Sequence, residues 1–207
     1  MRRVLGALAL YVLTVLSAPA WAQDATQAQQ LIAQGNAAGV FEPLASEQLI
    51  AVRHNRSGLV CRLQPANTNR LVIFPQAARG EDVACDTTDG TESFTFYATR
   101  FSFETSLDEL MRGATQAIHQ RFPDARELPS PASAGGVLPA SRSAHYMVTR
   151  QDGALMYTRV TVAMVGQWAI KLRYTVLAPD DEAARRGEAA AAALWNATLS
   201  ELTQART

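Results

Sequence analysis

Short runs of alternating apolar and polar residues fill the middle of the chain and return near its end. Between Leu49 and Arg100, four or five strands are predicted, and the runs are LIAVRH, LVCRL, RLVIFP, DVACDT and ESFTFYATR. NRSG, PANTN and TTDGT lie between them and contain residues that tolerate turn geometry. Three further strands are predicted over about 143–150, 154–164 and 168–177. Reversals this short favour antiparallel pairing.

Helical periodicity occurs in three places. Residues 24–38 are rich in alanine and glutamine and predict a short helix that ends at Gly39. TSLDELMRGATQAIHQRFPD predicts a longer helix, which Ser106 and Glu109 begin as a capping box. A third helix is predicted from about Asp181 to Gln204. Its expected inward stripe is Ala184, Ala191, Leu194, Trp195, Thr198 and Leu202.

These elements predict an α+β fold with a mainly antiparallel sheet, two main helices and one disulfide. Residues 23–207 are long enough for a single domain with a sizeable core. Within this domain, residues 123–140 are rich in proline and glycine and predict a long surface connection.

The second half of this pattern resembles the PsbP/Mog1-like family. The resemblance covers roughly residues 90–207 and lies in the order of SFTFYATR, SLDEL, a proline-rich stretch, MVTRQDGALMYTRV, WAIKLRYTVLAPD and a terminal helix. It is a resemblance of architecture more than of motif, and the cysteine-bearing strands before residue 90 fit it less well. The family comprises binding and assembly-accessory proteins that are not enzymes. The resemblance therefore implies a role in binding a partner and supplies no catalytic residues.

The amino terminus has the composition of a secretory signal peptide. Arg2 and Arg3 precede an apolar run from Val4 to Leu16, and small residues lead to a cleavage site after Ala22. This run is too short to cross a bilayer as a helix, and no comparable run follows. We therefore expect residues 1–22 to be removed, leaving a periplasmic or secreted chain without a transmembrane segment.

Cys61 and Cys85 are the chain's two cysteines. In an oxidising compartment, a disulfide is the expected state of such a pair. The sequence contains no C-x-x-C motif and no histidine at ligand spacing from either cysteine, which argues against a redox or zinc site. We therefore predict a Cys61–Cys85 disulfide.

Side-chain alternation in the last three strands predicts a candidate site. The stripe Met156–Met164 is expected to pair with the stripe Trp168–Val176 through a three-residue loop, Val165 to Gln167. A second three-residue loop, Gln151 to Gly153, joins the preceding strand. This register predicts that His145 faces Arg159, that Arg159 faces Arg173, and that Lys171 faces Thr161. With Tyr157 nearby, the predicted site for an anion or a partner is His145, Tyr157, Arg159, Lys171 and Arg173. The alternative is that solvent, or acids from a helix or loop, balance this row of like charges.

Composition excludes several classes of function. After removal of residues 1–22 the chain has 17 basic and 19 acidic residues, and no basic-aromatic cluster indicates nucleic-acid binding. His54, His119 and His145 are not at metal-ligand spacing, and no cofactor motif is present. We expect a binding or envelope-accessory module whose partner is an envelope protein or a small anionic or apolar ligand. Two alternatives stay open: a carrier with a cavity near Trp168 and Trp195, and a small hydrolase that uses His145 or His54.

Overall fold

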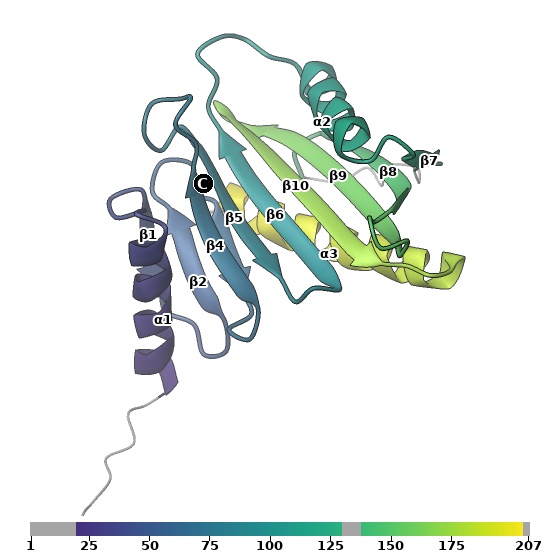
Figure 1. Cartoon of the computed structure of the whole chain (residues 1–207). Helices are drawn as coiled ribbons and strands as arrows, with labels where there is room; N and C mark the ends of the chain where they lie inside the picture. Colours follow the sequence, from purple (N-terminus) through teal and green to yellow (C-terminus); the bar gives the residue numbers. More distant parts are fainter. Residues whose placement is uncertain (1–19, 130–137, 205–207) are drawn as a thin grey trace, which may run out of the picture.

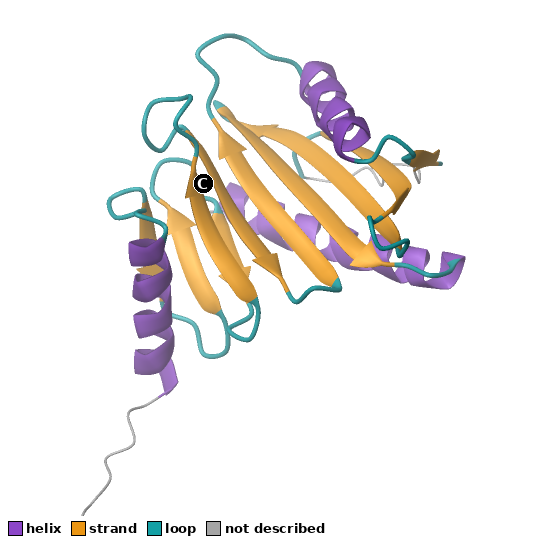
Figure 2. Ribbon diagram, viewed as in Figure 1, coloured by secondary structure: helices purple, strands orange, loops and turns teal. Residues whose placement is uncertain are grey.

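A computed structural model describes residues 20–129 and 138–204 and shows an α+β fold with two antiparallel sheets (Figure 2). The helices are α1 (Ala20–Gln34), α2 (Leu107–Arg121) and α3 (Asp181–Gln204). The first strands are β1 (Phe41–Leu44), β2 (Ile50–His54), β3 (Val60–Leu63), β4 (Thr68–Ile73) and β5 (Asp82–Thr88). The later strands are β6 (Glu92–Thr99), β7 (Arg126–Leu128), β8 (Ser141–Thr149), β9 (Leu155–Val165) and β10 (Trp168–Leu177).

The larger sheet has seven strands in the order β4-β5-β6-β10-β9-β8-β7. The main core fills one of its faces, where α3 and the smaller sheet pack. On the opposite face, α2 packs over β8 and β9 through Ala114 and Ile118. None of the described helices lies over the same face of β4, β5, β6 and β10 (Figure 1). We call this uncovered area the open face.

The smaller sheet has three strands in the order β1-β2-β3. A disulfide joins Cys61 of β3 to Cys85 of β5, and both residues are fully buried. The disulfide prediction is therefore confirmed, and the bond ties the two sheets together. Helix α1 packs beside the small sheet and against the edge strand β4.

Local sequence signals account for the helix boundaries. Ser106 and Glu109 form the expected capping box at the start of α2. Helix α1 ends at Gln34, earlier than expected, because Asn36 adopts a left-handed backbone with φ of 48°. The backbone NH of Ala37 then donates to the carbonyl of Ile32, which closes the end of the helix. Helix α3 spans the predicted residues but buries Leu199 where Thr198 was expected.

Two strands of the structure were not predicted from the sequence. Strand β1 lies between α1 and the first predicted run, and β7 lies inside the 123–140 connection. Both are short, with four and three residues, so neither shows a clear alternation. The predicted signal sequence falls on residues 1–22, of which 1–19 lie outside the described residues.

Candidate functional site

The observed register separates the five predicted site residues. His145 faces Arg159, as predicted. Arg159, however, faces Tyr174, while Arg173 faces Val160 and Lys171 faces Val162. The predicted pairs Arg159–Arg173 and Lys171–Thr161 are therefore wrong by one residue. Because successive side chains point to opposite sides of a strand, this shift places Lys171 and Arg173 on the open-face side of the sheet.

The cause is the turn between β9 and β10. It contains two residues, Gly166 and Gln167, since Val165 pairs with Trp168. Gly166 has φ of 60°, as the first position of a type II′ hairpin requires. The loop is thus one residue shorter than expected. The loop between β8 and β9 does have the predicted three residues, with Gly153 at φ of 85°.

His145, Tyr157 and Arg159 lie on the α3 side and are buried. His145 Nδ1 and the Tyr157 hydroxyl form a hydrogen bond of 2.6 Å. Arg159 Nε donates to Thr161 Oγ1 over 2.9 Å, and Arg159 Nη2 donates to Ser143 Oγ over 3.1 Å. Burial, followed by the nearby Arg159 charge, lowers the pKa of His145 to about 4. This group is therefore an internal polar network with a neutral histidine at pH 7.

The open face is built from rows of side chains that run across four strands. Arg70, Asp86, Thr95 and Arg173 are successive partners in one row, from β4 to β10. Arg70 Nη2 donates to Asp86 over 2.8 Å, and the Thr95 hydroxyl donates to the other carboxylate oxygen over 2.7 Å. Asp86 thus interacts directly with Arg70 and Thr95, while Arg173 lies at the far end of the row.

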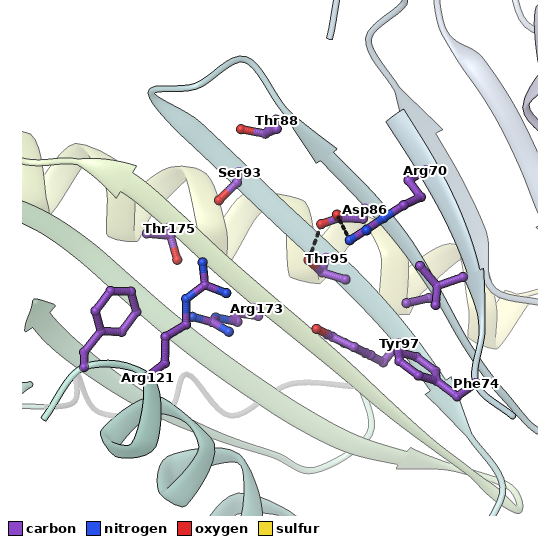
Figure 3. Close-up of a pocket in the computed structure, with 13 residues that line it drawn as sticks. Arg70, Phe74, Asp86, Thr88, Ser93, Thr95, Tyr97, Arg121, Arg173 and Thr175 are labelled. Atoms are coloured by element: carbon purple, nitrogen blue, oxygen red, sulfur yellow. Dashed lines mark hydrogen bonds and ion pairs between the residues drawn. The ribbon is translucent and has the colours of Figure 1, made fainter. Parts of the chain in front are cut away.

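Arg121 and Phe122 border the open face at the end of α2. The guanidinium carbon of Arg121 lies 5.5 Å from the centre of the Phe122 ring, and that of Arg173 lies 5.9 Å from it. Figure 3 shows the Arg121 side chain extending from α2 towards Arg173. Burial, followed by the Arg121 charge, lowers the pKa of Arg173. Among the described residues, no carboxylate lies within ion-pair distance of either guanidinium.

An aromatic pair borders the other end of the open face. Tyr97 and Phe74 stack with their ring centres 6.3 Å apart. The Lys171 ammonium lies 4.0 Å from the centre of the Tyr97 ring, a cation–π contact. Burial lowers the pKa of Lys171. The ammonium is therefore held on the ring, beside the hollow that Arg173 lines.

Two adjoining hollows run along the open face. The first has a volume of about 560 Å³ and extends from Phe74 and Tyr97 to Arg173. The second has a volume of about 570 Å³ and extends from Thr175 to Pro123 and Arg150. Both are lined by Thr88, Ser93, Arg121, Phe122 and Thr175. We call the two hollows together the open-face groove. Its size is that of a small-molecule site.

The other histidines do not lie in this groove. His54 Nδ1 lies 2.7 Å from Ser57 Oγ, but both residues are buried within a tight turn. Ser57 Oγ also accepts from the backbone NH of Leu59, so this serine holds the turn together. Burial lowers the pKa of His54 to about 4. His119 is exposed on α2 with its ring against Tyr146.

The carrier hypothesis places a cavity near Trp168 and Trp195. Both indoles are buried in the main core, and Trp195 Nε1 donates to Ser141 Oγ over 3.2 Å. A hollow that Trp168 lines opens on the surface beside Ser57 and Gly58. The carrier and the hydrolase stay hypotheses.

Within residues 20–129 and 138–204, no group of three or more histidine, cysteine or acidic side chains could hold a metal ion. None of the helices in these ranges combines the length and the hydrophobicity of a membrane span.

Comparison with known proteins gives no assignment: the chain matches no protein-family model, and no curated protein matches it significantly.

Sequence reasoning identified Arg173 and Lys171 but missed Arg70, Tyr97 and Arg121 as their neighbours. These residues lie on β4, β6 and the end of α2, and only the sheet order brings them together. Phe122 directly follows Arg121 near the end of the segment that predicts this helix, and this adjacency was the one available signal.

Proposed function

We propose that the protein is an exported, non-enzymatic binding module of the periplasm or the secreted fraction, and that it binds its ligand or partner in the open-face groove. The observation that carries this proposal is the pair Arg121 and Arg173, which border one groove without a carboxylate at ion-pair distance among the described residues. Arg173 is partly buried, and burying a cationic group without a counter-charge costs free energy that a bound anion would offset. Arg121 is exposed and adds a second positive charge at the same groove.

Export is supported by two features. The first is the signal-like sequence of residues 1–22, and the second is the Cys61–Cys85 disulfide, a bond typical of oxidising compartments. Membership of the PsbP/Mog1-like family is part of the proposal. It is supported by the order of the elements after residue 90 and by an antiparallel sheet with α2 and α3 on its opposite faces.

Two measurements test the proposal. Mass spectrometry of the protein purified from an envelope fraction should give a chain that starts near Gln23. The full-length chain in the cytosol, with both thiols reactive without reductant, would refute export.

The second measurement is an affinity capture from the envelope fraction with the oxidised protein. We expect a species that the wild type retains and that Arg121→Gln/Arg173→Gln loses. Arg185→Gln is the matched control, because Arg185 is exposed on α3, on the other side of the sheet. Equal retention by all three proteins would exclude the open-face groove as the binding site.

A further inference from the structure

The open-face groove is lined by cationic and hydroxyl side chains, and also by the carboxylates Asp86, Glu92 and Asp124. The cationic and hydroxyl side chains carry the argument for a ligand. Its cationic part is Arg121 and Arg173, which approach the same Phe122 ring from α2 and β10. A guanidinium presents several N–H donors in one plane and suits the oxygen pairs of carboxylate and phosphate groups. Two guanidinium groups that share a hollow therefore favour an oxyanion as their ligand.

The acidic side chain closest to this pair in the row does not replace such a ligand. Asp86 is already engaged by Arg70 and Thr95, at 2.8 and 2.7 Å. Its charge acts on Arg173 from a distance and favours the cationic form, but it follows burial and the Arg121 charge in importance. The position between the two guanidinium groups is thus left for an external anion.

The hydroxyl part of the groove is a row on its floor. Thr88 of β5 faces Ser93 of β6, and Ser93 faces Thr175 of β10. The Ser93 hydroxyl makes no hydrogen bond to any part of the chain that the structure describes. Figure 3 shows Ser93, Thr175 and Thr95 around the same space as the two arginines. The Thr88 hydroxyl already donates to the Glu92 carbonyl, and the Thr175 hydroxyl is hydrogen-bonded to that of Thr158, so both keep acceptor capacity only in part. Ser93 can both donate and accept, which suits a ligand hydroxyl group.

Together these features identify a class of ligand. We propose that the open-face groove binds a small polyhydroxylated anion, a sugar acid or sugar phosphate, with the oxyanion between Arg121 and Arg173 and its hydroxyl groups on the row of Thr88, Ser93 and Thr175. The volume of the first hollow, about 560 Å³, accommodates a molecule of this size. This inference rests on the proposed function and specifies the ligand of the same groove.

The test is titration calorimetry on the oxidised protein with four probes: D-glucuronate, D-glucose 6-phosphate, D-glucose and inorganic phosphate. We expect at least one of the two anionic sugars to bind, and D-glucose to bind at least tenfold more weakly. Binding of only glucuronate or only glucose 6-phosphate would show whether the oxyanion is a carboxylate or a phosphate. The affinity should fall as the salt concentration rises.

Variants separate the two parts of the site. Arg121→Gln and Arg173→Gln should each weaken the anionic sugar at least tenfold, while Arg185→Gln leaves it unchanged. Ser93→Ala should weaken the anionic sugar but not inorganic phosphate, because phosphate lacks the hydroxyl groups of the sugar.

Three results would overturn the inference: binding of D-glucose as tight as that of the anionic sugars, binding of inorganic phosphate as tight as theirs, or no binding of any probe. The proposed function is judged separately. If the envelope capture still depends on Arg121 and Arg173 while no probe binds, the groove is a binding site for a different class of ligand.

Discussion

Tyr174, and not Arg173, lies directly opposite Arg159 in the pair of strands β9 and β10. The two arginines therefore lie on opposite faces of the seven-stranded sheet. Arg159 is buried against Thr161 and Ser143, whereas Arg173 lines the open-face groove. The two arginines therefore have different surroundings, and substitutions can test them separately.

The first prediction concerns these two arginines. Arg173→Gln should abolish retention of the captured ligand or partner and change the free energy of unfolding by less than about 1 kcal/mol, because the side chain contacts a groove and not the core. Arg159→Gln should leave retention by the folded fraction unchanged, since Arg159 lies on the α3 side. Retention and urea unfolding, measured on both variants, check this. Loss of retention in Arg159→Gln alone would contradict the assignment of the groove.

The second prediction concerns pH. Burial lowers the pKa of both His54 and His145 from 6.5 to about 4. Between pH 6.5 and pH 4, both histidines are protonated in the unfolded chain but stay neutral in the folded chain. The free energy of unfolding is therefore highest above pH 6.5 and decreases as the pH falls towards 4. Between pH 6.5 and pH 5 each histidine should reduce the free energy of unfolding by about 1.5 kcal/mol.

Urea unfolding at several pH values measures the slope of the free energy of unfolding against pH. NMR of the imidazole rings tests whether the histidines cause it. The ring signals of His54 and His145 should not move between pH 7 and pH 5.5. Rings that titrate near pH 6.5 would show that neither histidine is held neutral by burial. His145→Gln should remove about half of the slope.

The third prediction concerns the disulfide between the two sheets. Cys61 and Cys85 are 24 positions apart, so the bond closes a loop of about 25 residues in the unfolded chain. Replacing both cysteines with serine should lower the free energy of unfolding by about 3.5 kcal/mol in the chain-entropy description. Urea unfolding of the double variant measures the loss, and thiol quantification of the denatured wild type should find no reactive thiol. Equal stability with and without the bond would show that it is not a constraint on folding.

The fourth prediction uses two helical glycines as a matched pair. A Cβ atom on Gly187 of α3 would lie 2.6 Å from Val176 Cγ1 and 3.1 Å from Tyr157 Cδ1, whereas one on Gly113 of α2 would meet nothing within 4 Å. Gly113→Ala should therefore stabilise the protein by about 0.5–1 kcal/mol through helix propensity. Gly187→Ala should destabilise it by about 1–3 kcal/mol, because the overpacking outweighs that gain. Thermal or urea unfolding of both variants checks the signs, and a stabilising Gly187→Ala would show that α3 packs less closely on β9 and β10.

Much of the fold follows from local physical chemistry. The capping box at Ser106, the turn at Asp89 and Gly90, and the three-residue loop before Ala154 each use residues whose preferred backbone or hydrogen bonds specify the structure. The disulfide could be predicted because only two cysteines exist and the signal-like sequence suggested an oxidising compartment. The capping box and the two turns do not depend on distant contacts.

The register of β9 and β10 could not be obtained from alternation. Strand β9 is buried on both faces over most of its length, from Met156 to Ala163, because α2 covers one face and α3 the other. A strand that is buried on both sides has apolar residues at odd and even positions, so alternation no longer identifies its faces. Gly166 followed by Gln167 was the local signal for a two-residue turn. This turn, and not the apolar alternation of Met156–Met164, sets the register of the two strands.

By itself, the sequence determined most of the strands, the helices, most turns and the disulfide, because each depends on backbone preference, hydrophobic period or the pairing of two thiols. The tertiary structure alone decided which face each arginine occupies and that Arg70, Tyr97, Arg121 and Arg173 surround one groove. The physical reason is that strand order, turn length and the partial cover by α2 are settled by packing between segments far apart in the chain.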